Sequence, residues 1–504
     1  METIIQALTF LNDNILWGIP MIIAILATGI LLTVRTKALQ VRKFKTSVST
    51  TIAPTVKSIF KPKKDTKNGE KTVSQFEAVS AAISGTVGTG NIIGVAGAML
   101  AGGPGAVFWM WVSAFFGLVT NYSENVLGLY YRKKDKDGNI SGGPMYYISE
   151  GIHQKWLAVV FAVCCMLAAL GMGMVQANSI SGTIKTTVAP GNADTQTVIA
   201  WIVGAVLVLV TALIVIGGIK RIGKVASMIV PFMALLFIIC ALIIIVINIK
   251  TVPAAFGAIF ASAFSFKSIT GGLFGYAIMK GMRYGFARGI FSNEAGLGSS
   301  VIAHSASDTK EPVKQGLWGV FEVFLDTFVI CTLTAVSLLS VGAGKGIDFA
   351  DIAANAGMDK NVVAGLAFTE TFGTFGSVLF SVILPLFAFT TILAWSYYGQ
   401  KAAEFLGGQN EKRQKVLAVA FKVCFVGLLL VAALVKSDFV WLLDDIFNGM
   451  MALPNLAALI CLSGLVAKIS KNYFDRKKGI AVAPMLSAYP ERNEELAAQL
   501  SDED

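Results

Sequence analysis

The chain has 504 residues, of which 55% are hydrophobic and 14% are charged, and its mean hydropathy is +0.68. Apolar stretches near 20 residues recur along its whole length, which excludes an ordinary water-soluble domain and predicts a membrane protein. Its 41 Lys and Arg exceed its 31 Asp and Glu, but the distribution of these charges explains them without a nucleic-acid partner.

Eleven membrane-spanning helices are predicted from the apolar runs. They cover residues 15–34, 76–101, 106–131, 157–184, 197–217, 225–248, 270–290, 315–341, 370–402, 415–435 and 440–467. No signal-peptide cleavage motif follows the first run, so we expect it to remain as a membrane helix. The pattern therefore predicts an all-α polytopic membrane protein.

Basic residues concentrate in alternate loops. Of the 41 Lys and Arg, 35 lie in the segments 35–75, 132–156, 218–224, 280–314, 401–422 and 468–504. Because loops rich in Lys and Arg stay in the cytoplasm, we expect the N-terminus outside and the C-terminus inside the cell. We interpret the basic segment 35–75 as a solvated linker that touches anionic lipid headgroups.

One predicted helix carries residues that weaken helices. Residues 83–105 read ISGTVGTGNIIGVAGAMLAGGPG and contain eight glycines, each costing about 1 kcal/mol relative to alanine. Close helix packing explains the later glycines, but not the polar cluster SGTVGTGN. Non-helical backbone persists at membrane depth only where it is buried in protein or lines a cavity. We therefore predict a break that presents backbone groups to a polar guest.

A second glycine cluster lies five predicted helices later. Transporters built from inverted repeats break one helix in each half, and SITGGLFG places Gly271, Gly272 and Gly275 in the outer half of the seventh predicted helix. We therefore expect one extra N-terminal helix and a core of five plus five helices, with broken first and sixth core helices. The expected divisions are an extra helix in 1–34, a linker in 35–75, repeats in 76–248 and 249–467, and a cytoplasmic tail in 468–504.

Seven longer motifs add a family resemblance. They are GTVGTGN, GGPGAVFWMWVSAFFG, SGGPMYY, GMGMVQANSI, RGIFSNEAGLGSS, FEVFLDT and TTILAWSYYG, between residues 85 and 399. A chain with these motifs resembles the alanine or glycine:cation symporter family of prokaryotes. The resemblance implies sodium-coupled import of alanine or glycine across the plasma membrane, by a leucine-transporter-type fold with one extra helix. The segment VGTGN is also similar to the V-G-x-G-N of the broken first helix of that fold.

An amino-acid zwitterion needs N–H donors for its carboxylate and oxygen acceptors for its ammonium group. A half-helix that begins near the first break offers free N–H groups at its positive end, and carbonyls of the second break can meet the ammonium group. The resemblance implies that Gln176 faces the pocket. Trp395, one helical turn past Thr391, would exclude substrates with large side chains. The predicted substrate contacts are Thr89, Gly90, Asn91, Gln176, Gly272, Gly275 and Trp395.

Sodium is the expected coupling ion, and no organic cofactor is expected. A hard cation takes oxygen ligands, and the carbonyl of Phe387 with the hydroxyls of Thr390 and Thr391 shares one helix face. The resemblance adds the carbonyls of Ser84 and Val87. The alternative for both threonines is hydrogen bonding to their own helix.

Acidic residues inside membrane segments are costly and mark function or pairing. The five here are Glu124, Glu322, Asp326, Asp444 and Asp445. Glu322 and Asp326 lie on one helix face, where they either relay protons or brace the cytoplasmic half through FSNEAGLGSS. A cluster at the inner mouth is predicted as an inner gate formed by Arg283, Arg288 and Glu294.

Four other functions are weighed against a sodium symporter. A proton-driven symporter of the same fold and an amino-acid sensor without flux both remain open. A channel would need a repeated filter or rings of like residues, and the sequence has neither. An enzyme would need a catalytic constellation of His, Cys or acids, which is also missing from the sequence, so we expect no enzymatic activity.

Overall fold

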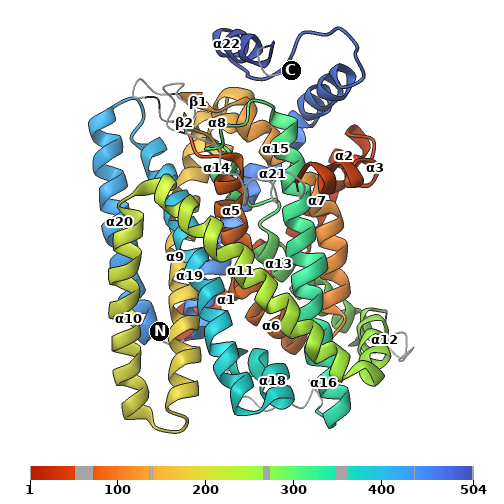
Figure 1. The fold of residues 1–504 in the computed structure, drawn as a ribbon, viewed down its shortest axis with the longest axis vertical. Helices are drawn as coiled ribbons and strands as arrows, with labels where there is room; N and C mark the ends of the chain where they lie inside the picture. The colour runs from red at the N-terminus through yellow and green to blue at the C-terminus, as the bar shows by residue number, and fades with distance from the viewer. Residues whose placement is uncertain are drawn as a thin grey trace.

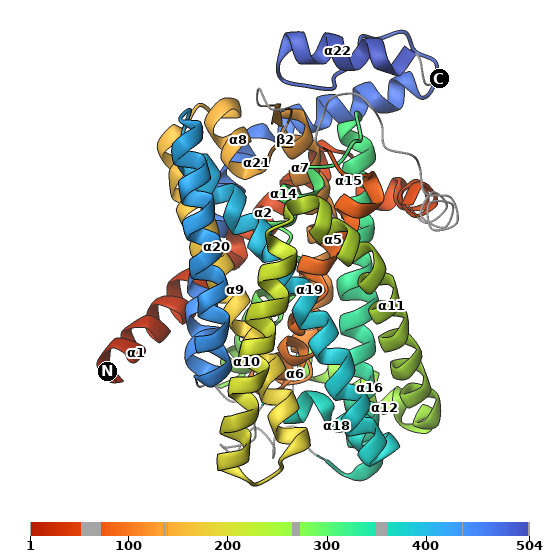
Figure 2. The same ribbon diagram turned by 60° about the vertical axis from the view of Figure 1, so that its left-hand side comes forward.

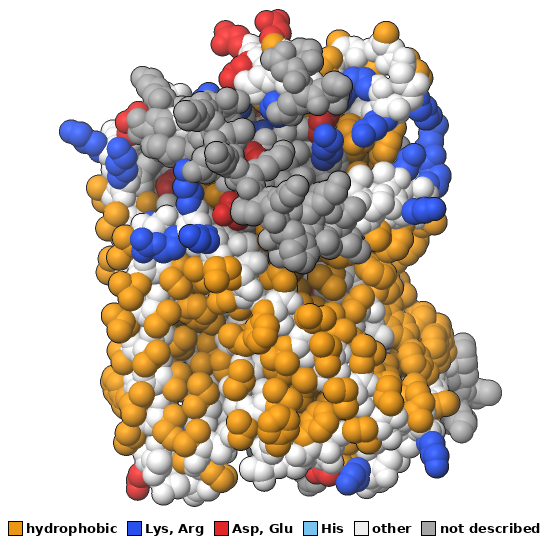
Figure 3. Space-filling view, viewed as in Figure 1, with side chains coloured by type: hydrophobic (Ala, Val, Ile, Leu, Met, Phe, Trp, Pro, Cys, Tyr) orange, Lys and Arg blue, Asp and Glu red, His pale blue; other side chains and the backbone are white. Residues whose placement is uncertain are grey.

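The computed structural model describes residues 2–51, 72–134, 138, 140–264, 273–347, 360–435 and 437–501. These residues form a bundle of long helices that run between two chemically different ends (Figure 1). On the face drawn in Figure 3, Lys and Arg gather toward the end that carries the C-terminal helix. We call this the basic end, and the opposite one the far end. Figure 3 shows a broad apolar belt between them, as expected for a surface that faces lipid.

The N-terminal region precedes the bundle core. Its helices are α1 (Glu2–Phe10), the π-helical turn η1 (Leu11–Leu16), α2 (Ile19–Arg35) and α3 (Leu39–Arg42). Figure 2 shows α1 slanting away from the bundle. Part of the predicted solvated linker instead packs against the core, because the buried Ser47 donates a 2.6 Å hydrogen bond to the carbonyl of Leu317.

The first half of the core contains five helices, and the first of them is broken. They are α5 (Gln75–Thr86) with the 3-10 turn η2 (Thr89–Asn91) and α6 (Ile93–Gly102), then α7 (Ala106–Tyr130), α9 (Lys155–Val188), α10 (Ala193–Val215) and α11 (Gly218–Ile247).

The second half repeats this order. Its helices are α13 (Leu273–Asn293) with α14 (Ser300–His304), then α15 (Pro312–Val323) continued by η5 (Phe324–Cys331) and α16 (Thr332–Lys345), α19 (Thr374–Leu406), α20 (Glu411–Leu434) and α21 (Ser437–Arg476). Together with the N-terminal helix, these confirm the expected core of five plus five helices. Among the described residues, eight helices are long and apolar enough to cross a membrane.

Short elements at the two ends were not predicted. They are the antiparallel strands β1 (Lys133–Lys134) and β2 (Ile140–Ser141), α8 (Pro144–Tyr146), η3 (Tyr147–Gly151), η4 (Ile249–Thr251), α12 (Val252–Ala263), α18 (Lys360–Phe372) and α22 (Pro490–Ser501). Helices α12 and α18 lie at the far end, whereas α22 caps the basic end (Figures 1 and 2).

The first break lies where the glycine-rich cluster predicted it. Helix α5 starts with a capping box between Ser74 and Glu77, which satisfies orphan N–H groups at that end. The helix ends at Thr86, and Gly88 adopts an extended backbone with φ −133° and ψ −151°. Helical structure resumes in η2 and α6, so the polar cluster SGTVGTGN does interrupt a core helix.

A second break lies at a different place from the one predicted. Gly272 is outside the described residues, and Gly275 is part of the continuous helix α13. The chain leaves the helix only at Glu294, where φ is +55°, and it resumes as α14. Gly296 and Gly298 then take φ of +98° and +77°, which favours glycine. The predicted break at SITGG lies outside the described residues, and the described residues contain a break at NEAGLG.

Each half of the first broken helix packs against one half of the second. Helix α14 packs on α5 near the basic end, and α13 packs on α6. The approach of α13 is close, since a Cβ built on Gly102 would lie 3.1 Å from the Cα of Gly281. Lys280, Arg283 and Arg288 therefore belong to the half of α13 that leads to the far end. These three residues of the segment 280–314 lie in a helix and not in a loop.

Candidate binding site at the two helix breaks

The first break is stabilised by a side chain of its own turn and by one from α9. The N–H of Gly88 donates to Oδ1 of Asn91 at 2.9 Å, which closes the turn on itself. The N–H of Thr89 donates to Oε1 of Gln176 at 3.3 Å, and Nε2 of Gln176 donates to the sulfur of Met172. The structure thus brings Gln176 to the break, where it occupies an N–H group that was predicted for a substrate carboxylate.

The hydroxyl of Thr89 is buried and has no hydrogen-bond partner among the described residues. A buried hydroxyl without a partner costs free energy, so a polar guest at this break would find a donor and acceptor already in place. Gly90, next in the chain, sits against Phe291 and Ser292 of α13, with a built Cβ 3.0 Å from the Phe291 ring. The first break therefore packs closely at Gly90 against the end of α13, where a side chain would crowd Phe291.

Four of the five predicted sodium ligands form a chain of contacts. The hydroxyl of Thr391 donates to the carbonyl of Ser84 at 2.9 Å and to that of Phe387 at 3.1 Å. The hydroxyl of Thr390 donates to the same Phe387 carbonyl at 3.0 Å. The fifth predicted ligand, Val87, directly precedes Gly88, where a Cβ would collide with the Thr391 hydroxyl. These oxygens come from α5 and α19, which are far apart in the sequence.

The two threonines differ in one respect. The Thr390 hydroxyl also donates to the carbonyl of Leu386 at 3.1 Å and contacts the sulfur of Met233. Its backbone partners are therefore carbonyls of its own helix. Thr391 crosses to α5. The alternative of bonding within the helix therefore describes Thr390 better than Thr391.

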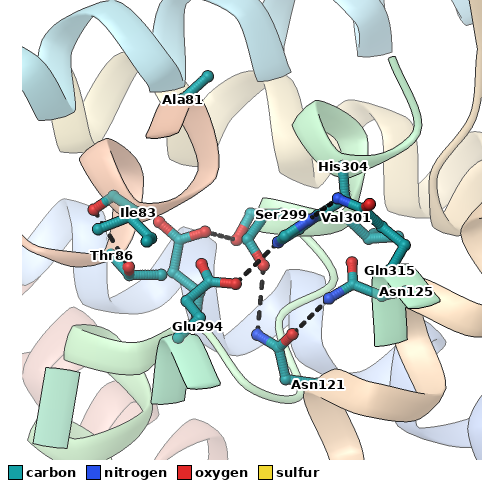
Figure 4. A network of polar contacts seen from close by, with 12 residues as sticks. Ala81, Ile83, Thr86, Asn121, Asn125, Glu294, Ser299, Val301, His304 and Gln315 are labelled. Carbon is teal, nitrogen blue, oxygen red and sulfur yellow. Dashed lines mark hydrogen bonds and ion pairs between the residues drawn. The ribbon is translucent and has the colours of Figure 1, made fainter. Parts of the chain in front are cut away.

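The predicted pocket wall, Trp395, is tied to the second break. Its indole N–H donates to Oε1 of Glu294 at 2.9 Å, while Oε2 of Glu294 accepts from Ser299 at 2.5 Å. Figure 4 shows Glu294 and Ser299 joined in this way. Both Trp395 and Glu294 are fully buried. A Cβ on Gly85 would lie 3.1 Å from Oε1 of Glu294, so the pair packs directly against α5.

Asp326 joins the two breaks to each other. Its Oδ1 accepts from Asn91 of the first break at 2.5 Å, and its Oδ2 accepts from Ser292 at 2.9 Å, just before the second break. Thr327 donates to the same oxygen at 2.8 Å. Three donors surround this buried carboxylate, an arrangement that braces the site, as one of the two interpretations of Asp326 expected.

The predicted inner gate does not form one cluster. Arg283 pairs with Asp13 of η1, and Arg288 makes a bidentate ion pair with Asp445 of α21 at 2.9 and 2.5 Å. Both arginines precede the break on the half of α13 that leads to the far end, whereas Glu294 lies in the break itself. The expected arrangement at the inner mouth is therefore wrong, because α13 runs from the far end toward the middle of the bundle.

Sequence reasoning missed how the second break is stabilised. Oε1 of Glu124 accepts from the N–H of Gly296 at 2.9 Å and from Nδ2 of Asn455 at 2.5 Å. Nδ2 of Asn455 also donates to the carbonyl of Gly296 at 2.9 Å. A membrane-buried acid and amide were therefore signals for this break, since freed backbone groups at membrane depth require such partners.

Chemically, the site combines backbone groups of two broken helices, a set of neutral oxygens and a buried polar side chain. Neutral oxygens suit a monovalent hard cation, and paired donors and acceptors suit a small zwitterion.

Comparisons with known proteins agree with this interpretation of the site. Residues 1–485 match the profile of the sodium:alanine symporter family.

Two curated relatives extend along nearly the whole chain. The sodium/alanine symporter AgcS of Methanococcus maripaludis is 39% identical over 476 residues, covering 93% of this chain and 97% of the relative. The probable sodium/glutamine symporter GlnT of Bacillus subtilis is 33% identical over 479 residues, covering 95% and 92%. The names of these relatives differ in the amino acid carried.

A solved structure shares the fold. The crystal structure of MhsT in complex with L-phenylalanine has a TM-score of 0.55 and 16% sequence identity, and covers 79% of this chain and 98% of that one. At this identity the likeness concerns the fold alone, and it agrees with the order of core helices described above.

Proposed function

Because the chain belongs to the sodium:alanine symporter family, we propose that it imports alanine or glycine together with sodium by alternating access. The family and its relatives are sodium-coupled amino-acid symporters rather than enzymes. The proposal concerns the ion, the amino acid, the residues that bind them and the direction of transport. The observation that carries it is the oxygen chain Ser84–Thr391–Phe387–Thr390 beside the first break.

The proposed ion site lies between α5 and α19. Sodium would take the carbonyls of Ser84, Val87 and Phe387 and the hydroxyls of Thr390 and Thr391. In the structure the Thr391 hydroxyl links Ser84 and Phe387, so the hydroxyl must turn its lone pairs inward when the cation binds. Ion binding would then hold α5 against α19.

The proposed substrate site lies at the meeting of the two breaks. The carboxylate would take the N–H groups of Thr89 and Gly90, with Asn91 shaping the turn, and Gln176 would shift from the Thr89 N–H to the ammonium group. Carbonyls for the ammonium group would come from 294–299 rather than from Gly272 and Gly275, because Gly275 lies 19 residues before Glu294, or about 28 Å along a helix. The buried Trp395 would limit the size of the side chain.

Contacts on both sides of the breaks support alternating access. Toward the far end, the Arg288–Asp445 ion pair links α13 to α21. Toward the basic end, Val73 just before α5 pairs with the segment after α14, where its N–H donates to Ala306 at 3.1 Å and its carbonyl accepts from Asp308 at 2.9 Å. We propose that these two contacts open in alternation. The basic end would face the cytoplasm, following the positive-inside rule.

The test is uptake of radiolabelled alanine into proteoliposomes, with and without an inward sodium gradient at equal pH on both sides. Unlabelled glycine, leucine and glutamine serve as competitors. We expect sodium-dependent accumulation that glycine blocks and leucine does not. Competition by glutamine alone would reassign the substrate, and uptake driven by a pH gradient without sodium would reassign the coupling ion.

A further inference from the structure

A buried histidine forms a second polar centre, separate from the proposed ion and substrate sites. His304 ends α14, and both it and Glu322 of α15 are 0% exposed. Nε2 of His304 lies 2.8 Å from Oε2 of Glu322, and Nδ1 lies 2.6 Å from Nε2 of Gln315. Figure 4 shows His304 and Gln315 beside the second break. Nothing in the proposed transport chemistry uses this imidazole.

The orientation of the Gln315 amide determines which protonation state of the His304 imidazole it can bind. If the Gln315 amide donates to Nδ1, the imidazole is neutral and its proton is on Nε2, facing Glu322. If the amide turns, its oxygen accepts from a protonated Nδ1 and the imidazole becomes a cation. Gln75 contacts the Gln315 oxygen at 3.1 Å and can turn in the same way. The chain from Gln75 to Glu322 therefore fits two proton states without a change of fold.

The surroundings favour binding a proton at this centre. Oε1 of Glu322 is buried with no hydrogen-bond partner among the described residues. Four titratable groups from neighbouring elements interact with the Glu322 carboxylate: Glu124 on α7, Glu294 in the break, Asp326 on η5 and Tyr398 on α19. Like charges raise one another's free energy in a medium of low dielectric constant. An imidazolium beside Glu322 would offset this repulsion.

The centre is also next to a contact proposed to open. Gln75 is the first residue of α5, two residues after Val73, and its side chain is only partly buried. When α5 leaves the segment 306–308, the Gln75–Gln315 contact would break, and His304 would gain access to water at the basic end. This step rests on the proposed alternating access.

We propose that His304 and Glu322 form a proton-binding site that exchanges with the basic end each time α5 moves, so that its occupancy sets the transport rate. The proton adds to Nδ1 of His304, forming one N–H bond and an imidazolium beside the Glu322 carboxylate. On release the proton returns to water at the same end.

The chain makes a direct test possible because it contains two histidines. We would label the histidine rings with ¹³C and ¹⁵N and follow the two NMR signals of the purified full chain between pH 5 and 9. The variant H153Q removes the signal of His153, which is exposed, and so assigns the remaining signal to His304. We expect the His304 signal to change from the neutral to the charged form within this range. E322Q removes the carboxylate beside Nε2 and should change the pH dependence of the His304 signal, whereas E150Q, which alters a surface ion pair, should not.

A His304 signal that never changes, or a midpoint that E322Q leaves in place, would overturn the proposal. The second arm is sodium-driven alanine uptake at equal pH on both sides. We expect the rate to follow pH in the wild type and in H153Q, and to vary by less than about twofold in H304Q. If the uptake rate of H304Q depends on pH as that of the wild type does, the proposal is also contradicted. A titrating His304 in a chain that shows no alanine uptake would refute the proposed function and leave the proton site standing.

Discussion

The hydroxyl of Thr391 provides the sharpest test of the proposed ion site. Thr391→Val keeps the shape of the side chain and removes the group that reaches Ser84 at 2.9 Å and Phe387 at 3.1 Å. Losing one oxygen from a buried polar site costs about 1–3 kcal/mol, which corresponds to a rise of about 5- to 150-fold in the half-saturating sodium concentration. The interhelical hydrogen bond itself contributes only about 0.6 kcal/mol, so the variant should fold.

The assay is the sodium activation curve of alanine uptake in proteoliposomes, with thermal unfolding as a check on folding. Thr391→Ser keeps the hydroxyl and should stay within about threefold of the wild type. Thr390→Val should cause a smaller change than Thr391→Val, because its hydroxyl bonds to its own helix and to Met233. A half-saturating sodium concentration within twofold of the wild type in Thr391→Val would refute the assignment of this ligand.

Three further variants probe the neighbouring contacts. Gly88→Ala should raise the half-saturating sodium concentration by at least about fivefold, since its methyl group would crowd Thr391 at a cost of about 1–3 kcal/mol; unchanged sodium activation would contradict this. Gln176→Ala removes the amide oxygen that is proposed to accept from the ammonium group and should weaken alanine binding by about tenfold, measured by calorimetry. Asp445→Asn should slow uptake at least about tenfold, because it breaks the ion pair with Arg288. A double variant with the charges exchanged, Arg288→Asp with Asp445→Arg, should recover part of the rate. Equal uptake rates in the wild type and in Asp445→Asn would exclude a gating role for this pair.

The positions of the core helices and of the first break were predictable because their signals are local. Apolar runs near bilayer length mark the helices, and SGTVGTGN puts polar residues and glycines together where the first helix breaks. The Thr390–Thr391 pair could likewise be recognised on one helix face. Its contact with Ser84, 307 residues earlier in the chain, was expected only through the family resemblance.

The break at NEAGLG was not predicted because two glycine clusters flank the same helix, and the sequence pattern favoured the first. SITGG and NEAGLG are alike in composition, and in NEAGLG the backbone groups of Gly296 are satisfied by distant side chains. These partners, Glu124 and Asn455, lie 172 residues before and 159 residues after Gly296. The gate was misplaced for the same reason, since Arg288 finds Asp445 at a separation of 157 residues. Local composition carries no information about such distant pairings.

The contacts of the C-terminal segment have a consequence for synthesis in the cell. Arg476 holds Glu311 through two hydrogen bonds of 2.6 and 2.9 Å, and the N–H of Ala488 donates to the carbonyl of Tyr130 at 2.9 Å. Leu486 and Leu496 are buried. Residues 477–496 follow the ten core helices in the chain, so they are synthesised after those helices and complete the basic end last. A nascent chain would pass through a stage in which every span is present and this closing contact is not.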